Sequence, residues 1–205
     1  MSEILGYLSS FALSVIDKTG YAGVFILSLL ESAGIPIPSE VVVPFSGFLA
    51  VSGRFSFWFI VFVTTLGNFA GAIILYFIAK SGGRWILEKY GRYIFIHKRD
   101  LDLGDEWFSK HGVRAVFFGR LMPVVRTFIS IPAGVCKMNF YRFSLYTLLG
   151  SLPWNFALAL VGYKAGKNWD LLHRYFQKFD IVIIAVIVTI VVWYIVRHKR
   201  HKNNG

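Results

Sequence analysis

Charged residues are scarce in this sequence, and their scarcity excludes an ordinary soluble domain. They make up 16% of the 205 residues, whereas a soluble domain carries about a quarter. Hydrophobic residues make up 56%, and several apolar runs approach the length of a membrane-spanning helix. We therefore predict an all-α integral membrane protein that forms a single membrane domain over residues 1–205.

Cysteine is almost absent as well. The single Cys136 excludes an internal disulfide and a cysteine-based metal cluster, and we expect neither a metal nor another cofactor. The N-terminus lacks the basic start and the small-residue cleavage site of a signal peptide, so we expect residues 1–18 to be retained. This segment either spans the membrane as a short helix or lies at its interface.

The positive charge of the chain is large but comes without a nucleic-acid-binding motif. The formal net charge is +11, and we expect no nucleic acid as a partner. Four of the basic residues crowd the tail at 197–205, directly after the apolar run Ile181–Val196. Basic residues that flank a span favour the cytoplasmic side of a membrane, so the sequence predicts a cytoplasmic C-terminus.

Three apolar segments are long enough to cross a membrane or nearly so. Phe55–Ala79 has 25 residues without a charge, Phe143–Tyr163 has 21, and Ile181–Val196 has 16. A spanning helix needs about 20 apolar residues. We predict that all three are transmembrane helices, the last of which can be extended by its flanking residues.

Two further apolar regions are interrupted by helix breakers. The segment ESAGIPIPSE joins the runs 21–30 and 41–53, and the region 115–136 contains two prolines and two arginines. Broken backbone at membrane depth is tolerated only where protein buries it or where it lines a cavity. Both regions are therefore predicted to be re-entrant helical hairpins. The residues expected to shape them are Pro36, Pro38, Gly47, Pro123, Pro132 and Gly134.

The two halves of the chain resemble each other. Lys18-Thr-Gly20, followed by Val24-Phe25, matches Lys110-His-Gly112, followed by Val116-Phe117, at identical spacing. Each half holds a hairpin that does not cross and a helix that does, so the second repeat is predicted to be inverted. The predicted boundaries are 18–85 for repeat one, 80–112 for a cytoplasmic amphipathic linker, 110–169 for repeat two, and 179–205 for an added C-terminal transmembrane helix and tail.

Four charges fall inside the predicted hairpins: Glu31, Glu40, Arg120 and Arg126. Each costs about 2.5–3.5 kcal/mol at membrane depth on insertion scales, so we expect them to be paired, hydrated or functional. Guanidinium groups suit phosphate oxygens, and carboxylates can take up and release protons. A purely structural network that clamps the hairpins together is the alternative. Residues that line a cavity or bridge helices by hydrogen bonds are Asn68, Trp154 and Asn155.

Six motifs occur together over roughly residues 15–170. They are Glu31 with Pro36-Ile-Pro38-Ser-Glu40, Gly47-Phe48-Leu49-Ala50, Gly67-Asn68 with Gly71, Gly119-Arg120-x-x-Pro123-x-x-Arg126, Pro132-Ala133-Gly134, and Gly150 with Trp154. In this combination and order the motifs resemble the DedA family of membrane proteins, in the superfamily of the VTT (SNARE-associated Golgi protein) domain.

The resemblance implies a lipid translocase in the bacterial cytoplasmic membrane, with undecaprenyl phosphate as the substrate and protons or another cation as the coupling ion. It implies that Arg120 and Arg126 bind the lipid phosphate and that Glu31 and Glu40 carry the coupling. A translocase or scramblase of phosphatidylethanolamine or another phospholipid and a proton-coupled transporter of a small solute are the alternatives. A lipid phosphatase is disfavoured because its Ser-Arg motif is missing, and a homo-oligomer is compatible with the sequence.

Overall fold

The computed structural model describes residues 2–35, 37–90, 98–123 and 125–165, which belong to one compact unit. The predicted C-terminal transmembrane helix and basic tail lie outside the described residues, and so does Pro36.

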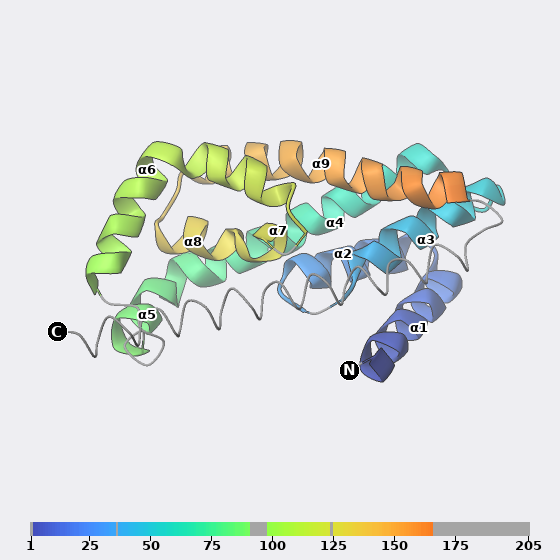
Figure 1. Ribbon diagram of the computed structural model, residues 1–205, viewed down its shortest axis with the longest axis horizontal. Helices are drawn as coiled ribbons and strands as arrows, with labels where there is room; N and C mark the ends of the chain where they lie inside the picture. Colours follow the sequence, from blue (N-terminus) through green and yellow to red (C-terminus); the bar gives the residue numbers. More distant parts are fainter. Residues whose placement is uncertain (1, 36, 91–97, 124, 166–205) are drawn as a thin grey trace, which may run out of the picture. The chain divides into compact units, whose positions relative to one another are not determined.

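All of the described secondary structure is helical, which confirms the predicted all-α class in this part of the chain (Figure 1). In order, the helices are α1 Ser2–Thr19, α2 Tyr21–Ser32, α3 Ser39–Val51, α4 Phe57–Ile78, the π-helical turn η1 Ala79–Gly83, α5 Arg84–Tyr90, α6 Lys98–Arg120, α7 Val125–Phe128, α8 Ser130–Val135 and α9 Phe140–Ala165.

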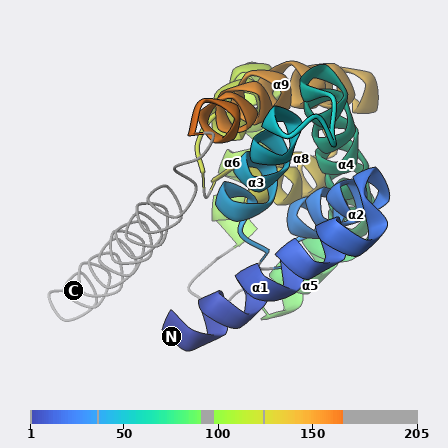
Figure 2. The same cartoon turned by 90° about the vertical axis from the view of Figure 1, so that its right-hand side faces the viewer.

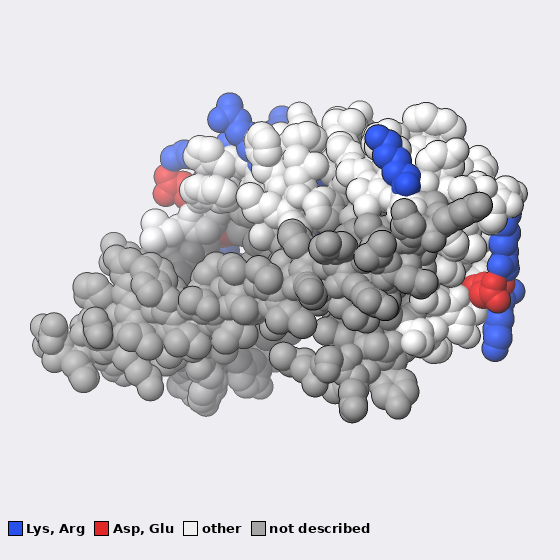
Figure 3. All heavy atoms as spheres, turned by 45° about the vertical axis from the view of Figure 1, so that its right-hand side comes forward, with Lys and Arg blue, Asp and Glu red and all other residues white. Residues whose placement is uncertain are grey.

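Two described helices are long and apolar enough to cross a membrane. They are α4 together with η1, over Phe57–Gly83, and α9, over Phe140–Ala165, and both contain most of a predicted span. Large apolar side chains such as Trp58, Ile78 and Leu152 are exposed along them. In the view of Figure 3 few charged side chains interrupt the uncharged surface. An exposed apolar surface of this kind suits contact with lipid chains.

Both predicted breaks lie where the prolines and a glycine stand. Helices α2 and α3 are separated by residues 33–38, where Gly34 has φ 101° and Pro38 precedes the first turn of α3. Positive φ is free of steric cost only for glycine. In the second half, Pro123 lies in the break between α6 and α7. Pro38 stands at the start of α3, where its missing N–H is not needed, and Pro123 follows the end of α6, where it cannot supply the donor that would continue the helix.

The boundary between the linker and the second hairpin is not a break. The sequence predicts an amphipathic linker over residues 80–112 and repeat two from residue 110, and α6 runs without interruption across both, from Lys98 to Arg120. No proline stands in this stretch, and its apolar residues recur at helical spacing, so nothing stops the helix at the change of polarity.

The hairpin arms pack crosswise on the two long helices, which also contact each other. In the first half α2 packs on α4, while α3 packs on α9. In the second half α6 packs on α9, while α8 packs on α4 and η1. Accordingly α3 and α8 lie toward opposite ends of Figure 1, and α1 lies beside α2 and α3 in Figure 2.

Glycines permit four of these close approaches. A Cβ placed on Gly67 would lie 2.6 Å from the carbonyl oxygen of Phe25, and one on Gly150 would lie 2.9 Å from that of Phe117. A Cβ on Gly47 would overlap the carbonyl oxygen of Ala159, and one on Gly134 would overlap that of Tyr76. Small residues let helix backbones meet in this way in membrane proteins, where helices associate by packing.

We expect Gly47→Ala to destabilise the protein, because the added methyl group meets backbone that cannot rotate away. Overpacking of this kind costs about 1–3 kcal/mol. The apparent unfolding temperature in detergent should fall by several degrees.

The matched control is Gly104→Ala in α6, where an added Cβ meets no atom within 4 Å. Alanine is a better helix former than glycine, so this variant should be neutral or slightly more stable. Equal unfolding temperatures for the two variants would contradict the close packing of α3 on α9.

Candidate functional site

The broken ends of α2 and α7 bring two opposite charges together. Glu31 lies in the last turn of α2 and is 6% exposed, and Arg126 lies in the short helix α7 and is 4% exposed. The Nη2 group of Arg126 donates a hydrogen bond to Oε1 of Glu31, across 95 residues of sequence. The pair therefore links the two broken hairpins inside the protein.

Arg120 is buried without a carboxylate partner. It ends α6 and is 2% exposed, and its Nη2 group donates to Oγ of Ser130 at 2.7 Å. Its Nε group has no hydrogen-bond partner, and no ion pair involves it among the described residues. A guanidinium group has five N–H donors, so most of its donors remain available. Arg120 is close enough to Arg126 and Glu31 to interact with both electrostatically.

Arg126 keeps one face and one donor for a further ligand. Its guanidinium carbon lies 5.5 Å from the centroid of the Trp154 ring, which is within cation–π range. Its Nε group, like the indole nitrogen of Trp154, is buried without a hydrogen-bond partner. Trp154 thus reaches the charged site, a role that the sequence could not separate from that of a core residue.

Glu40 lies apart from the arginines. It stands in the first turn of α3, half-buried, and its Oε2 accepts a hydrogen bond from Oγ of Ser39 at 3.1 Å. It interacts electrostatically with Glu31, and no described ion pair includes it. The four charged side chains therefore differ in their partners. Glu31 and Arg126 bind each other directly, while Arg120 and Glu40 each form a hydrogen bond with a serine hydroxyl.

The expected hairpin-shaping residues fall into two groups. Pro38 and Pro123 stand at the breaks, and Pro132 lies within α8 next to the second one. Gly47 and Gly134 stand inside helices and permit close packing instead.

Asn68 and Asn155 bridge the two long helices rather than standing apart in a cavity. The amide nitrogen of Asn68 donates to Oδ1 of Asn155 at 3.1 Å, and the amide nitrogen of Asn155 donates to Oγ1 of Thr65 at 3.2 Å. Asn68 is 1% exposed and Asn155 is fully buried. Of the possible cavity-lining residues, only Trp154 contacts the charged site.

Sequence reasoning missed the two serines of the site. Ser130 holds Arg120, and Ser39 holds Glu40. Both stand within two residues of a helix break or terminus, but a serine hydroxyl has no charge or spacing that singles it out in an apolar segment.

The arrangement can bind an anion. Arg126 pairs directly with the carboxylate of Glu31, Arg120 interacts with it only electrostatically, and both guanidinium groups have an unused donor. Planar guanidinium groups bind phosphate oxygens in pairs. In the described part of the chain, no group of three or more His, Cys, Asp or Glu side chains could hold a metal ion.

Residues 37–164, which include α3, the second broken hairpin, α4 and nearly all of α9, match the model of the VTT domain. The chain belongs to the VTT domain family, the DedA family of membrane proteins. It is 34% identical over 196 residues to an undecaprenyl phosphate transporter A of Bacillus subtilis, covering 96% of this chain and 97% of that protein.

Of two further relatives, one carries the same name and one a different name. One from Staphylococcus aureus, also named undecaprenyl phosphate transporter A, is 36% identical, with 91% and 96% of the two chains covered. One from Lactococcus lactis subsp. cremoris, named alkaline phosphatase-like protein, is 31% identical, with 88% and 86% covered. No solved structure matches the chain.

A double substitution separates a structural role of the central pair from a functional one. Arg126→Gln or Glu31→Gln alone leaves the other charge buried without its partner, which costs about 3–5 kcal/mol. The double variant Glu31→Gln/Arg126→Gln removes both charges and should recover most of the lost thermal stability in detergent.

If the double variant is as unstable as either single one, the two residues do not act as a coupled pair. The matched control is the exposed pair of Asp17 and Arg54, where the same neutralisation should change the unfolding temperature little.

Proposed function

We propose that the chain is a translocase of a phosphate-bearing lipid headgroup, undecaprenyl phosphate in particular, in the bacterial cytoplasmic membrane. The observation that carries this proposal is Arg120: a permanently charged group, buried, held by one serine hydroxyl, and next to a second arginine. A buried charge with unused donors is costly unless a ligand completes it. A phosphate dianion would supply both charge and acceptors.

The names of the relatives support the same substrate class. Two full-length relatives are named undecaprenyl phosphate transporters, and this chain covers nearly all of both. A polyprenyl phosphate has one phosphomonoester headgroup and a long apolar chain. In the proposed transport the headgroup crosses at the arginines, while the chain stays among the lipid tails.

Glu31 would couple the crossing to protons or another cation. Its carboxylate occupies one N–H group of Arg126, which a phosphate oxygen also needs. A proton on Glu31 removes the negative charge that competes for Arg126, so proton uptake favours phosphate binding. Glu40, which interacts electrostatically with Glu31, would act through that carboxylate.

Equivalent contacts in the two halves support an inverted repeat. Phe25 and Phe117 each stand five residues after the matched Gly20 and Gly112, and their carbonyls meet Gly67 and Gly150. Tyr76 and Ala159 each stand nine residues after those glycines and meet Gly134 and Gly47. Transporters built from inverted repeats with broken helices bind substrates near the midplane. A cytoplasmic C-terminus and re-entrant hairpins complete the proposed topology.

The transport itself is measured with purified protein in proteoliposomes. We expect the headgroup of undecaprenyl phosphate to cross faster than that of phosphatidylethanolamine, and an inward-directed pH gradient to change the rate. Arg120→Gln and Arg126→Gln should each reduce transport at least tenfold. The double variant Glu31→Gln/Arg126→Gln should stay inactive although its stability is recovered.

Other outcomes assign other functions. Transport of phosphatidylethanolamine alone would make the chain a phospholipid translocase or scramblase. Uptake of a soluble ion without any lipid requirement would make it a small-solute transporter, and release of inorganic phosphate from the lipid would favour hydrolysis. A stable double variant with normal transport would make the arginine–glutamate pair structural.

A further inference from the structure

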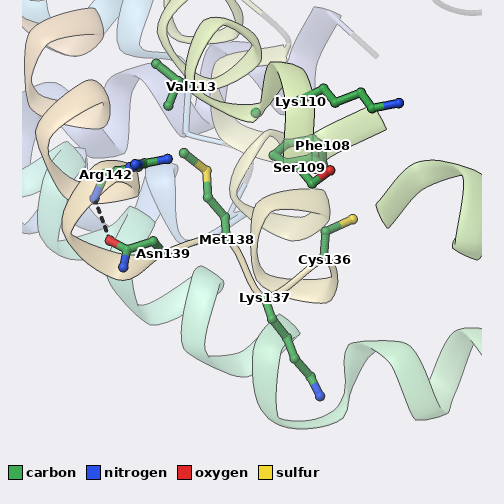
Figure 4. Close-up of a pocket in the computed structure, with 10 residues that line it drawn as sticks. Phe108, Ser109, Lys110, Val113, Cys136, Lys137, Met138, Asn139 and Arg142 are labelled. Carbon is green, nitrogen blue, oxygen red and sulfur yellow. Dashed lines mark hydrogen bonds between the residues drawn. The ribbon is translucent and has the colours of Figure 1, made fainter. Parts of the chain in front are cut away.

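A second basic site lies at the beginning of α9, away from the central arginines. Residues of α6 and of the connection from α8 to α9 enclose a pocket of about 270 Å³ (Figure 4). This is at the small end of ligand pockets and fits a group of the size of a phosphate. Its lining consists of Phe108, Ser109, Lys110, Gly112, Val113, Cys136, Lys137, Met138, Asn139 and Arg142.

The pocket has three cations and no carboxylate in its lining. Neither Lys137 nor Arg142 has an ion-pair partner among the described residues. Lys110 pairs with Glu106 at 2.7 Å, but both side chains are more than 60% exposed, and such surface pairs contribute little. In Figure 4 the guanidinium group of Arg142 extends toward Met138, while Lys110 and Lys137 point outward from the rim. The site therefore favours an anion over a cation.

In the first half of the chain, the basic residue that follows α3 is neutralised by a carboxylate. In the loop after α3, Arg54 forms an ion pair with Asp17 of α1. Asp17 directly precedes Lys18 of the repeated motif, and the residue that precedes the matching Lys110 is Ser109. The second half has Ser109 where the first half has that carboxylate, and no described ion pair involves Lys137 or Arg142.

The backbone at Lys137, which lines the pocket, has an unusual conformation. Lys137, the second residue after α8, has φ 48°. The second residue after α3 is Gly53, which has φ 76°. Non-glycine residues rarely adopt this conformation, and most helices that end in this way use glycine. The backbone N–H groups of Lys137 and Met138 donate to the carbonyls of Gly134 and Ala133, each at 3.0 Å. A lysine is therefore held at a position where glycine would cost less.

The pocket lies beside the first turn of the long apolar helix α9. Arg142 stands in the first turn of α9, which is long and apolar enough to span the membrane, so the pocket is near the boundary with water. Gly150, which contacts Arg120, stands eight residues further along α9, or about 12 Å at 1.5 Å per residue. The apolar side chains of Phe108, Val113 and Met138 beside the cations suit a ligand with an apolar chain.

We propose that this pocket, which we call the basic pocket, binds a phosphate group at the membrane surface, as the first or last station of a lipid phosphate that passes Arg120 and Arg126. The lipid source rests on the proposed function. The phosphate chemistry does not, because a free phosphate presents the same charge and the same acceptor oxygens.

The test reads occupancy of the basic pocket separately from transport. In the full chain with Cys136→Ala, Ser109→Cys is labelled with an environment-sensitive fluorophore; Ser109 is exposed and lines the pocket. The labelled protein is titrated with farnesyl phosphate, farnesol and inorganic phosphate. We expect farnesyl phosphate to change the fluorescence at lower concentration than inorganic phosphate, and farnesol to have no effect.

Four substitutions test whether the fluorescence signal comes from the basic pocket. Arg142→Gln should raise the half-saturating concentration of farnesyl phosphate at least fivefold, and Arg142→Lys, which keeps the charge, should raise it less than threefold. Lys164→Gln removes an equal charge from the other end of α9 and should change nothing. Arg126→Gln should keep the fluorescence response although it loses transport.

The outcomes separate this proposal from the proposed function. Equal responses to farnesyl phosphate and inorganic phosphate would support the phosphate site but make free phosphate its source. A response that Arg126→Gln abolishes and Arg142→Gln leaves intact would overturn the basic pocket, since the ligand would then bind at the centre. Normal transport of the lipid phosphate with no response in the labelled protein would also overturn it and leave the proposed function standing.

Discussion

Burial of two guanidinium groups away from water is the constraint around which the rest of this structure is arranged. Arg120 and Arg126 are 2% and 4% exposed, and arginine cannot escape the cost of burial by losing its proton. Each must therefore receive partners from elsewhere in the chain. Glu31 reaches Arg126 from the last turn of α2, and Ser130 reaches Arg120 from the first turn of α8. These partners stand beside breaks, because a continuous helix would leave no helix ends inside the protein.

The glycine contacts connect the packing of the helices with the charged site. A Cβ on Gly150 would lie 2.7 Å from Cβ of Arg120, so the backbone of α9 rests directly against the base of that side chain. Trp154, one turn further along α9, lies over Arg126. A shift of α9 relative to α6 and α7 would therefore move the surroundings of both arginines together. In the proposed inverted repeat, the crosswise contacts of Gly47 and Gly134 give each hairpin a long helix of the other half to move with.

The sequence predicted the features that depend on hydropathy and on backbone chemistry. Two long helices follow from apolar runs, and the breaks follow from Pro38 and Pro123, because proline acts on the backbone wherever it stands. The length of α6 could not be predicted in the same way, since a change of polarity does not stop a helix. The nearness of Glu31 to Arg126 was a reasonable hypothesis because so few charges are buried. Ser130 and Trp154 depend on the three-dimensional course of α7 to α9, which no spacing reveals.

Charge balance shows why a proton would accompany the phosphate in the proposed mechanism. A phosphomonoester carries a charge of about −1.5 to −2 near neutral pH. Together with Arg120 and Arg126 it forms a nearly neutral group, but the ionised Glu31 that pairs with Arg126 would add a further negative charge inside the protein. A net charge in a poorly hydrated interior is expensive, so phosphate binding and protonation of Glu31 favour each other. Release at the opposite side reverses both steps, because Glu31 regains Arg126 as it loses its proton. The basic pocket needs no such partner, since water reaches its rim and can screen the charge there.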